Sequence, residues 1–188
     1  MKLLRCHIEN FGVLSGFDQE FTEGLNVLCR ENGFGKSTLA AFIKAMFYGL
    51  PKSRTRSLTE NERKRYDPWQ GGKYGGFLEF EYQGVQYRVT RYFGKKEDSF
   101  ALYDLTNRTE STHFSENLGE ELFQLDADAF ARSTFVPQMS GRDVTATTSI
   151  RTKLTNLVED TNDLNNYDTA MKRLQDYRKK LKLFKGEG

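Results

Sequence analysis

Seven consecutive residues carry the clearest chemical signal in this chain: Asn32-Gly33-Phe34-Gly35-Lys36-Ser37-Thr38. They follow an apolar run at residues 25–29, which predicts a strand, and they precede a helical pattern at residues 39–48. A strand, a glycine loop containing Gly-Lys-Ser and a helix together form the context of a Walker A phosphate-binding loop. The glycines allow successive N–H groups to turn inward around an anion, and the helix N-terminus adds partial positive charge. The sequence therefore predicts a nucleotide phosphate site at residues 32–38.

Individual side chains of this loop have distinct expected roles. Lys36 would act on the β- and γ-phosphates, the Ser37 hydroxyl would bind Mg2+, and Thr38 would lie near the α-phosphate. The full motif begins with glycine where this chain has Arg30, and a side chain fits there only if its φ stays negative. An ordinary glycine turn before a basic helix is the alternative, and the flanking elements argue against it.

Composition limits the classes of protein to which the chain can belong. Its 188 residues predict one domain, or one domain with an appendage. Charged residues make up 29%, and no apolar run approaches the ~20 residues of a membrane helix, so we expect a cytoplasmic protein without a membrane partner. The net charge of +2 neither requires nor excludes nucleic acid. Cys6 and Cys29 lie in separate apolar runs and are expected to be buried free thiols, and His7 and His113 have no metal-type spacing.

The remaining apolar patterns predict an α/β fold. Alternating residues predict a hairpin of residues 2–9 with residues 17–21. The same alternation predicts an antiparallel meander beside the nucleotide sheet, built from residues 77–82, 85–93 and 100–105. Helical spacing predicts three further helices, at residues 58–65, 126–132 and 115–123, the last capped by Ser115.

The segment at residues 50–76 is basic and poor in aliphatic side chains. A solvated basic loop is one interpretation, and contact with the phosphates of a nucleotide or of DNA is the other. The sequence leaves both interpretations open. Charge reversal at Arg63 and Arg65 would separate them.

The C-terminal part of the chain has a different pattern. From Ile150 onward, leucines and other apolar residues recur at threes and fours, with an interruption at residues 162–166. This spacing predicts two helices with an apolar seam that requires a partner, and a hairpin folded back on the domain is the alternative. We therefore predict a nucleotide-binding lobe at residues 1–148 and the start of a coiled-coil arm at residues 149–188. The abrupt end of the arm suggests a truncation.

No clear match exists for the acidic strand motif with which P-loop enzymes support hydrolysis. The nearest candidate is Asp104, which follows four largely apolar residues but precedes Leu105 instead of Glu. We expect Asp104 to end a strand of the meander. Ser140-Gly141-Arg142 resembles a fragment of the signature of transporter-type ATPases, but it begins no clear helix. The phosphate cradle is thus predicted without its catalytic carboxylate.

Five segments in one order resemble the N-terminal lobe of SMC and SbcC-type (Rad-fifty-like) DNA-repair ATPases, especially the YhaN-like bacterial branch. These segments are residues 3–12, 32–38, 63–69, 87–93 and 135–138. The resemblance implies an ABC-type P-loop head that uses ATP and Mg2+, with Gln138 as the Q-loop glutamine that contacts Mg2+ and the attacking water. Gly12 stands where many relatives carry a basic residue near the nucleotide, so no such contact is assigned to it.

The resemblance also implies partners. The signature, the Walker B pair and the switch histidine would lie in the protein's own C-terminal lobe, and two heads would enclose two ATP molecules as a homodimer. DNA and a nuclease subunit of the SbcD kind are further expected partners. We therefore expect the ATP-binding lobe of a DNA-repair or chromosome-maintenance ATPase, with antiphage defence as a neighbouring role. A stand-alone P-loop kinase or GTPase and a non-hydrolysing tether are the alternatives, although no Asn-Lys-x-Asp guanine motif occurs.

Overall fold

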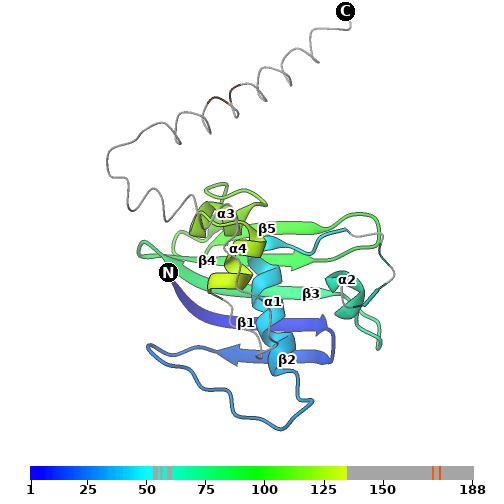
Figure 1. Ribbon diagram of the computed structural model, residues 1–188. Coiled ribbons are helices and arrows are strands. Elements are labelled where there is room, and N and C mark those ends of the chain that lie inside the picture. The colour runs from blue at the N-terminus through cyan, green and yellow to red at the C-terminus, as the bar shows by residue number, and fades with distance from the viewer. Residues whose placement is uncertain (53–54, 56, 59–60, 135–170, 172–173, 175–188) are drawn as a thin grey trace, which may run out of the picture. The chain divides into compact units, whose positions relative to one another are not determined.

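The computed structural model describes residues 1–52, 55, 57–58, 61–134, 171 and 174 (Figure 1). The chain divides into two compact units, Met1–Arg142 and Asp143–Gly188. The elements of the first unit, in chain order, are β1 (Lys2–Phe11), β2 (Leu14–Glu20), α1 (Lys36–Tyr48), α2 (Glu62–Arg65), β3 (Gly75–Tyr82), β4 (Val85–Tyr92), β5 (Ser99–Asp104), β6 (Thr109–Glu110), α3 (Leu118–Phe123) and α4 (Ala127–Ser133).

The strands form one antiparallel sheet in the order β2-β1-β3-β4-β5-β6. The predicted hairpin and the predicted meander are both confirmed. They join into a single sheet because β1 pairs with β3, where Cys6 lies opposite Leu78. The turn between β3 and β4 is the predicted Gln83-Gly84, whose positive φ angles of 51° and 80° are typical of a two-residue hairpin. The two-residue strand β6 was not predicted, since so short a run carries no periodicity.

Helix α1 crosses one face of this sheet and packs against β1, β3 and β4 (Figure 1). Its apolar residues recur at helical spacing, so they share the face that is buried. Phe42 meets the ring of Phe11 edge-on at a centroid distance of 5.4 Å, and Phe47 meets Phe80 at 5.6 Å. Each buried phenylalanine contributes about 1.5–3 kcal/mol. These contacts fix the direction of α1 and therefore the position of its N-terminus.

Helices α3 and α4 pack against the C-terminal part of α1. The ring of Phe123 meets Phe47 at 5.2 Å, and the Tyr48 hydroxyl donates to the carbonyl of Leu125 at 3.0 Å. The predicted helix at residues 126–132 is confirmed as α4, and Asp126 caps it by accepting the N–H of Ala129 at 2.7 Å.

The predicted start of the helix at residues 115–123 is wrong by three residues. Helix α3 begins at Leu118, and Ser115 does not cap it. The Ser115 hydroxyl instead binds the carboxylate of Glu121 and accepts the N–H of Asn117 at 3.1 Å. Ser115 therefore stabilises the turn that precedes the helix.

The predicted strand at residues 25–29 is also wrong, because the described structure shows no regular element there. Leu25 is 88% exposed and Val27 is 79% exposed. A strand requires a neighbour for its N–H and C=O groups, and none of the described strands pairs with this segment. Cys29 is consequently exposed, against the prediction, whereas Cys6 is buried as predicted.

In the second unit only Met171 and Leu174 are described, and both are helical. The predicted coiled coil, its boundary at residue 148 and Gln138 lie outside the described residues and stay predictions. Within the described part of the chain, no helix has the length and apolarity needed to cross a bilayer.

Candidate functional site

The predicted phosphate loop lies between the end of β2 and the start of α1, and glycine geometry shapes it. Gly33 and Gly35 have φ angles of +88° and +108°, which other residues adopt only with strain. A Cβ on Gly35 would lie 2.9 Å from Leu14 Cδ2, so this glycine also allows close contact with the β1–β2 turn. A Cβ on Gly33 would have no heavy atom within 4 Å. The backbone at Gly33 therefore faces open space that a ligand can occupy.

The N-terminus of α1 is uncapped. Gly35 occupies the cap position and has no side chain to accept the first N–H groups, while its carbonyl accepts the N–H of Leu39 at 2.8 Å. The first turn contains no acidic residue. Ser37 is exposed and Thr38 is half-buried at this end. Unpaired N–H groups and the positive end of the helix dipole make this terminus a site for an anion.

The side chain of Lys36 extends across the loop to two backbone carbonyls. Its Nζ donates to the carbonyl of Arg30 at 2.7 Å and to the carbonyl of Glu31 at 2.9 Å. These two bonds connect the residues on either side of the glycine turn. The positive charge of Lys36 is therefore held at the loop before any ligand arrives.

Arg30 occupies the position at which the full motif has glycine. The φ angle of Arg30 is not positive, which is the condition under which a side chain fits at this position. Its guanidinium lies 5.6 Å from the ring centroid of Phe34, and Phe34 meets Phe17 edge-on at 5.9 Å. Arg30 thus packs on the loop's own aromatic residue, which in turn rests on β2.

Three segments that are distant in sequence meet at Gly12. Its N–H donates to the carbonyl of Tyr66 at 2.7 Å. A Cβ built on Gly12 would lie 3.0 Å from Thr38 Cγ2 and 3.3 Å from Tyr66 Cδ1. A larger residue at Gly12 would adopt a strained positive φ of 56° and would press on Thr38 and Tyr66.

The sequence candidate for a catalytic carboxylate has a structural role. The nearest sequence candidate, Asp104, is the last residue of β5, as predicted, and its oxygens accept the backbone and side-chain N–H groups of Asn107 at 2.8 Å. Those hydrogen bonds lower the pKa of Asp104. Asp104 therefore stabilises a turn. Within the described ranges, no cluster of three or more His, Cys, Asp or Glu side chains could hold a metal ion.

The basic segment at residues 50–76 contains a structural arginine that the sequence did not reveal. Arg63 donates to both carboxylate oxygens of Asp98, at 2.9 and 2.5 Å, and to the carbonyl of Leu50 at 2.9 Å. Neither a solvated loop nor a phosphate contact describes this residue. Arg65 is exposed, with its guanidinium 5.6 Å from the ring centroid of Tyr66.

The glycine loop, the open helix terminus and the lysine across the loop together define a P-loop nucleotide-binding domain of the α/β class. A family profile described as an AAA domain matches residues 5–187. The chain belongs to this family of P-loop ATPases, and it is a nucleotide-binding ATPase domain.

One relative gives a more local match. Over 83 residues the chain is 32% identical to the uncharacterized protein YhaN of Bacillus subtilis (strain 168). The match covers 44% of this chain and 8% of YhaN. The chain therefore corresponds to a small part of that relative's length.

Proposed function

We propose that this chain is the ATP-binding lobe of an SMC-like head, whose hydrolysis requires further protein segments. The observation that carries the proposal is the uncapped N-terminus of α1 in a loop whose carbonyls hold the Lys36 amine. A nucleotide triphosphate would accept hydrogen bonds from the N–H groups of the glycine loop, and its β- and γ-phosphates would draw Lys36 away from the two carbonyls. Ser37, and Gln138 outside the described residues, would hold the Mg2+ that offsets the phosphate charge.

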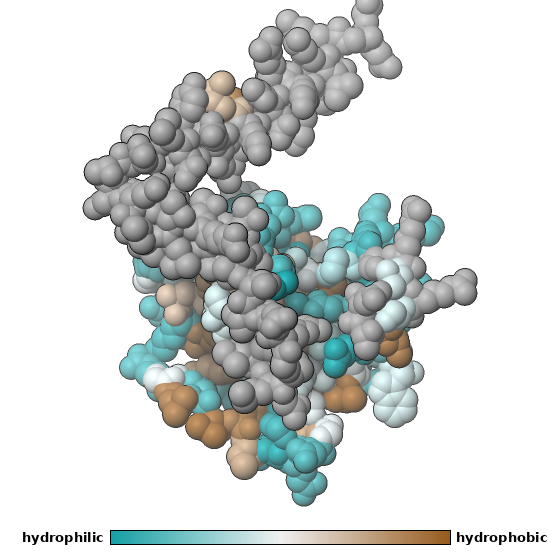
Figure 2. Space-filling view, in the orientation of Figure 1, coloured by the Kyte–Doolittle hydropathy of each residue, from teal (hydrophilic) through white to brown (hydrophobic). Residues whose placement is uncertain are grey.

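Exposed apolar side chains beside the loop support a composite site. Leu25, Val27 and Val13 are 88%, 79% and 55% exposed, respectively. Figure 2 shows apolar surface along the edge where the chain between β2 and α1 runs in Figure 1. Isolated exposed apolar residues are ordinary, but here they coincide with a segment that has the sequence of a buried strand. We infer that strands of a second lobe cover residues 25–29 and bring the missing catalytic carboxylate.

ATP would then close a dimer of two such heads, and hydrolysis would release it. Such closure uses the γ-phosphate to favour one of two arrangements of the heads. DNA contact, coupled through a coiled-coil arm, and a nuclease subunit of the SbcD kind complete the proposal. The sequence contains no clear Walker B pair, so we expect the 188-residue chain to bind ATP and to hydrolyse almost none.

Nucleotide binding tests the first part of the proposal. Lys36→Ala removes one charge-assisted contact, worth about 1.5–3 kcal/mol, so fluorescent ATP should bind about 10–150-fold more weakly in the presence of Mg2+. Lys95→Ala is the matched control, because Lys95 is an exposed lysine of the β4–β5 connection. Equal affinity of Lys36→Ala and the wild-type chain would refute the assignment of the site.

Thiol labelling tests the composite site. Cys29 is exposed in this chain, so it should react rapidly with a maleimide. In a longer polypeptide that includes the C-terminal lobe, labelling of Cys29 should slow by at least tenfold, and DNA should stimulate ATP hydrolysis. Unchanged labelling would contradict the covering lobe. ATP binding without hydrolysis would favour the non-hydrolysing tether.

A further inference from the structure

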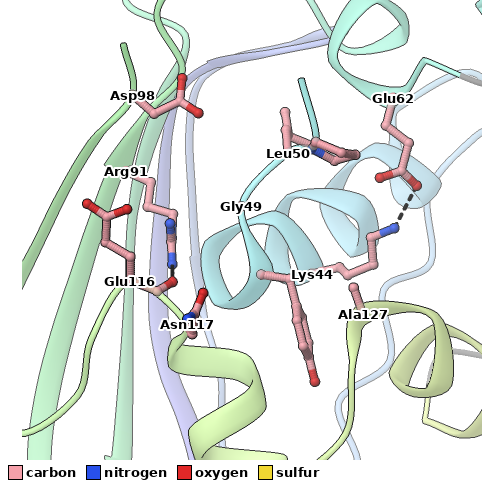
Figure 3. A pocket seen from close by; sticks show the side chains of 11 residues that line it. Lys44, Gly49, Leu50, Glu62, Arg91, Asp98, Glu116, Asn117 and Ala127 are labelled. Carbon is pink, nitrogen blue, oxygen red and sulfur yellow. Dashed lines mark hydrogen bonds and ion pairs between the residues drawn. The ribbon is translucent and has the colours of Figure 1, made fainter. Parts of the chain in front are cut away.

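A cavity of about 380 Å³ lies at the C-terminal end of α1, opposite the phosphate loop (Figure 3). The walls come from the C-terminal half of α1 and the residues that follow it, from α2, from β4 and the β4–β5 connection, from the segment before α3 and from the first residue of α4. The charged side chains that line it are Lys44, Glu62, Arg91, Asp98 and Glu116. Its volume is within the range of small-molecule sites.

Arg91 is the most deeply buried of these charges, with 6% of its surface exposed. Its Nε donates to the carbonyl of Met46 at 2.8 Å, and its Nη2 donates to the carbonyl of Glu116 at 2.5 Å. The guanidinium also lies 4.5 Å from the ring centroid of Phe100. These contacts hold the guanidinium plane in one orientation. They join β4 to the end of α1 and to the segment before α3.

The charge of Arg91 has no carboxylate partner within ion-pair distance among the described residues. The neighbouring Asp98 is bound by Arg63 instead. The Nη1 group of Arg91 makes no hydrogen bond in the described structure and lies 3.5 Å from the point that a Cβ on Gly49 would occupy. Gly49 lines the cavity, so Nη1 is at its wall. The carboxylates of Glu116 and Asp98 attract this charge at longer range, but neither forms an ion pair with it. An anion in the cavity would give the Nη1 group a direct, charged acceptor.

Burial lowers the pKa of Arg91 to about 10. The side chain is therefore still protonated at neutral pH, when it can donate to an anion. Lys44 adds a second cation, and its Nζ donates to Glu62 at 2.6 Å while its side chain is only 15% exposed. Figure 3 shows the Lys44 and Arg91 side chains reaching the cavity from α1 and β4, respectively.

The other lining groups restrict the kind of anion. Three carboxylates, those of Glu62, Asp98 and Glu116, line the same cavity and would repel a phosphate dianion more than a singly charged group. Apolar side chains also line the cavity, from Leu50, Pro51 and Ala127. A ligand with one negative group and a short aliphatic portion fits both features.

We propose that this cavity binds a small aliphatic monocarboxylate, whose oxygens accept from Arg91 Nη1 and whose carbon chain lies against Leu50, Pro51 and Ala127. Binding of the monocarboxylate does not require a nucleotide at the phosphate loop. The proposed site is therefore separate from the ATP site and does not rest on the function proposed above. A free acid and a protein carboxylate share this chemistry, and the small volume favours the free acid.

Titration of the 188-residue chain with sodium butyrate tests the proposal, followed by NMR shifts of backbone amides. Butyrate should shift the amides of Lys44, Gly49 and Arg91 saturably at millimolar concentration. Butyramide, an uncharged molecule of the same shape, should not, and inorganic phosphate should bind there at least tenfold more weakly. A capped tripeptide with a central glutamate distinguishes the sources, and it should bind more weakly than butyrate. Tighter binding of the tripeptide would overturn the assignment to a free acid.

Four variants test whether butyrate binds in this cavity. Ala127→Phe fills the cavity without removing a hydrogen bond of Arg91 and should abolish butyrate binding, whereas Ala131→Phe on the same helix should leave it unchanged. Arg91→Lys should weaken binding at least tenfold. Lys36→Ala should bind butyrate as the wild type does, which separates this site from the phosphate loop. Unsaturable butyrate shifts, or wild-type butyrate affinity in a folded Ala127→Phe variant, would overturn the proposal.

Discussion

Replacing Arg63 by alanine should lower the free energy of unfolding of the sheet domain. This effect should be seen in the absence of nucleic acid. The side chain of Arg63 is 18% exposed and that of its partner Asp98 is 30% exposed. Arg63→Ala removes two hydrogen bonds to the carboxylate and two to backbone carbonyls, those of Leu50 and Gly94. The lost groups connect α2 to the end of α1 and to the β4–β5 connection.

The size of the effect follows from burial. Breaking a fully buried ion pair costs about 3–5 kcal/mol, and an exposed pair contributes at most about 1 kcal/mol. The partial exposure of this pair places the expected loss between these limits, at about 2–3 kcal/mol. Arg65→Ala is the control, because Arg65 is exposed and its described contact is with the ring of Tyr66, so the loss should be below about 0.5 kcal/mol.

Urea unfolding followed by tryptophan fluorescence and circular dichroism measures both losses. A double-mutant cycle with Asp98→Asn isolates the pair, and we expect a coupling of about 1–2 kcal/mol. A loss below about 1 kcal/mol for Arg63→Ala, or an equal loss for Arg65→Ala, would refute the structural role of Arg63. The alternative that Arg63 contacts a phosphate would then regain support.

The same pair has a pH signature. Burial is the largest single influence on Asp98 and opposes its ionisation, but the hydrogen bonds and charge of Arg63, the N–H of Gly94 and the charge of Lys52 together lower the pKa below its ordinary value of 3.8. A lowered folded-state pKa stabilises the fold above the unfolded pKa, and this stabilisation is lost as the pH falls through the folded pKa. The difference in stability between the wild type and Arg63→Ala should therefore be constant near pH 7 and narrow below about pH 4. A difference that persists unchanged at pH 2.5 would contradict this origin.

Further substitutions test other features of the domain. In Gly33→Ala the new methyl group has no neighbour, so only the strained φ should lower the free energy of unfolding, by about 1–2 kcal/mol, while nucleotide binding is lost. In Gly35→Ala the methyl group also meets Leu14 and Val13, so the loss should be about 2–5 kcal/mol. Urea unfolding and ATP titration measure both effects. Burial raises the pKa of the Cys6 thiol to about 12, so a disulfide reagent at pH 8 should modify one thiol, Cys29, in the folded chain and two in urea. Asp126→Ala should destabilise the domain by about 1 kcal/mol through loss of the α4 cap, and no change in thermal midpoint would contradict that role.

The sequence predicted the elements that local periodicity specifies. The β-hairpin, the meander and helix α1 are all confirmed, because alternation or helical spacing already identifies the buried face of each. The segment at residues 25–29 shows where this reasoning fails. Its composition suits a buried strand, but a strand forms only beside a neighbour, which any part of a chain can supply, and none of the described strands provides one.

The site was predictable in part for a related reason. The glycines and Lys36 are contiguous, so their spacing alone places them in one loop. The partner of Arg63 is Asp98, which lies 35 residues away and has no pattern connecting it to the arginine. Likewise, the buried Arg91 stands in an ordinary strand pattern, and only the fold shows that its guanidinium meets the end of α1.

The two carbonyl acceptors of Lys36 make nucleotide binding an exchange of partners. The ammonium already donates to Arg30 and Glu31, so a ligand gains only the difference between its own oxygens and those carbonyls. A single phosphate group gains this net Lys36 contact alone, whereas a polyphosphate chain also adds acceptors for the loop N–H groups. We therefore expect inorganic phosphate and nucleoside monophosphates, which are abundant competitors in any cell, to bind this loop more weakly than a nucleoside triphosphate.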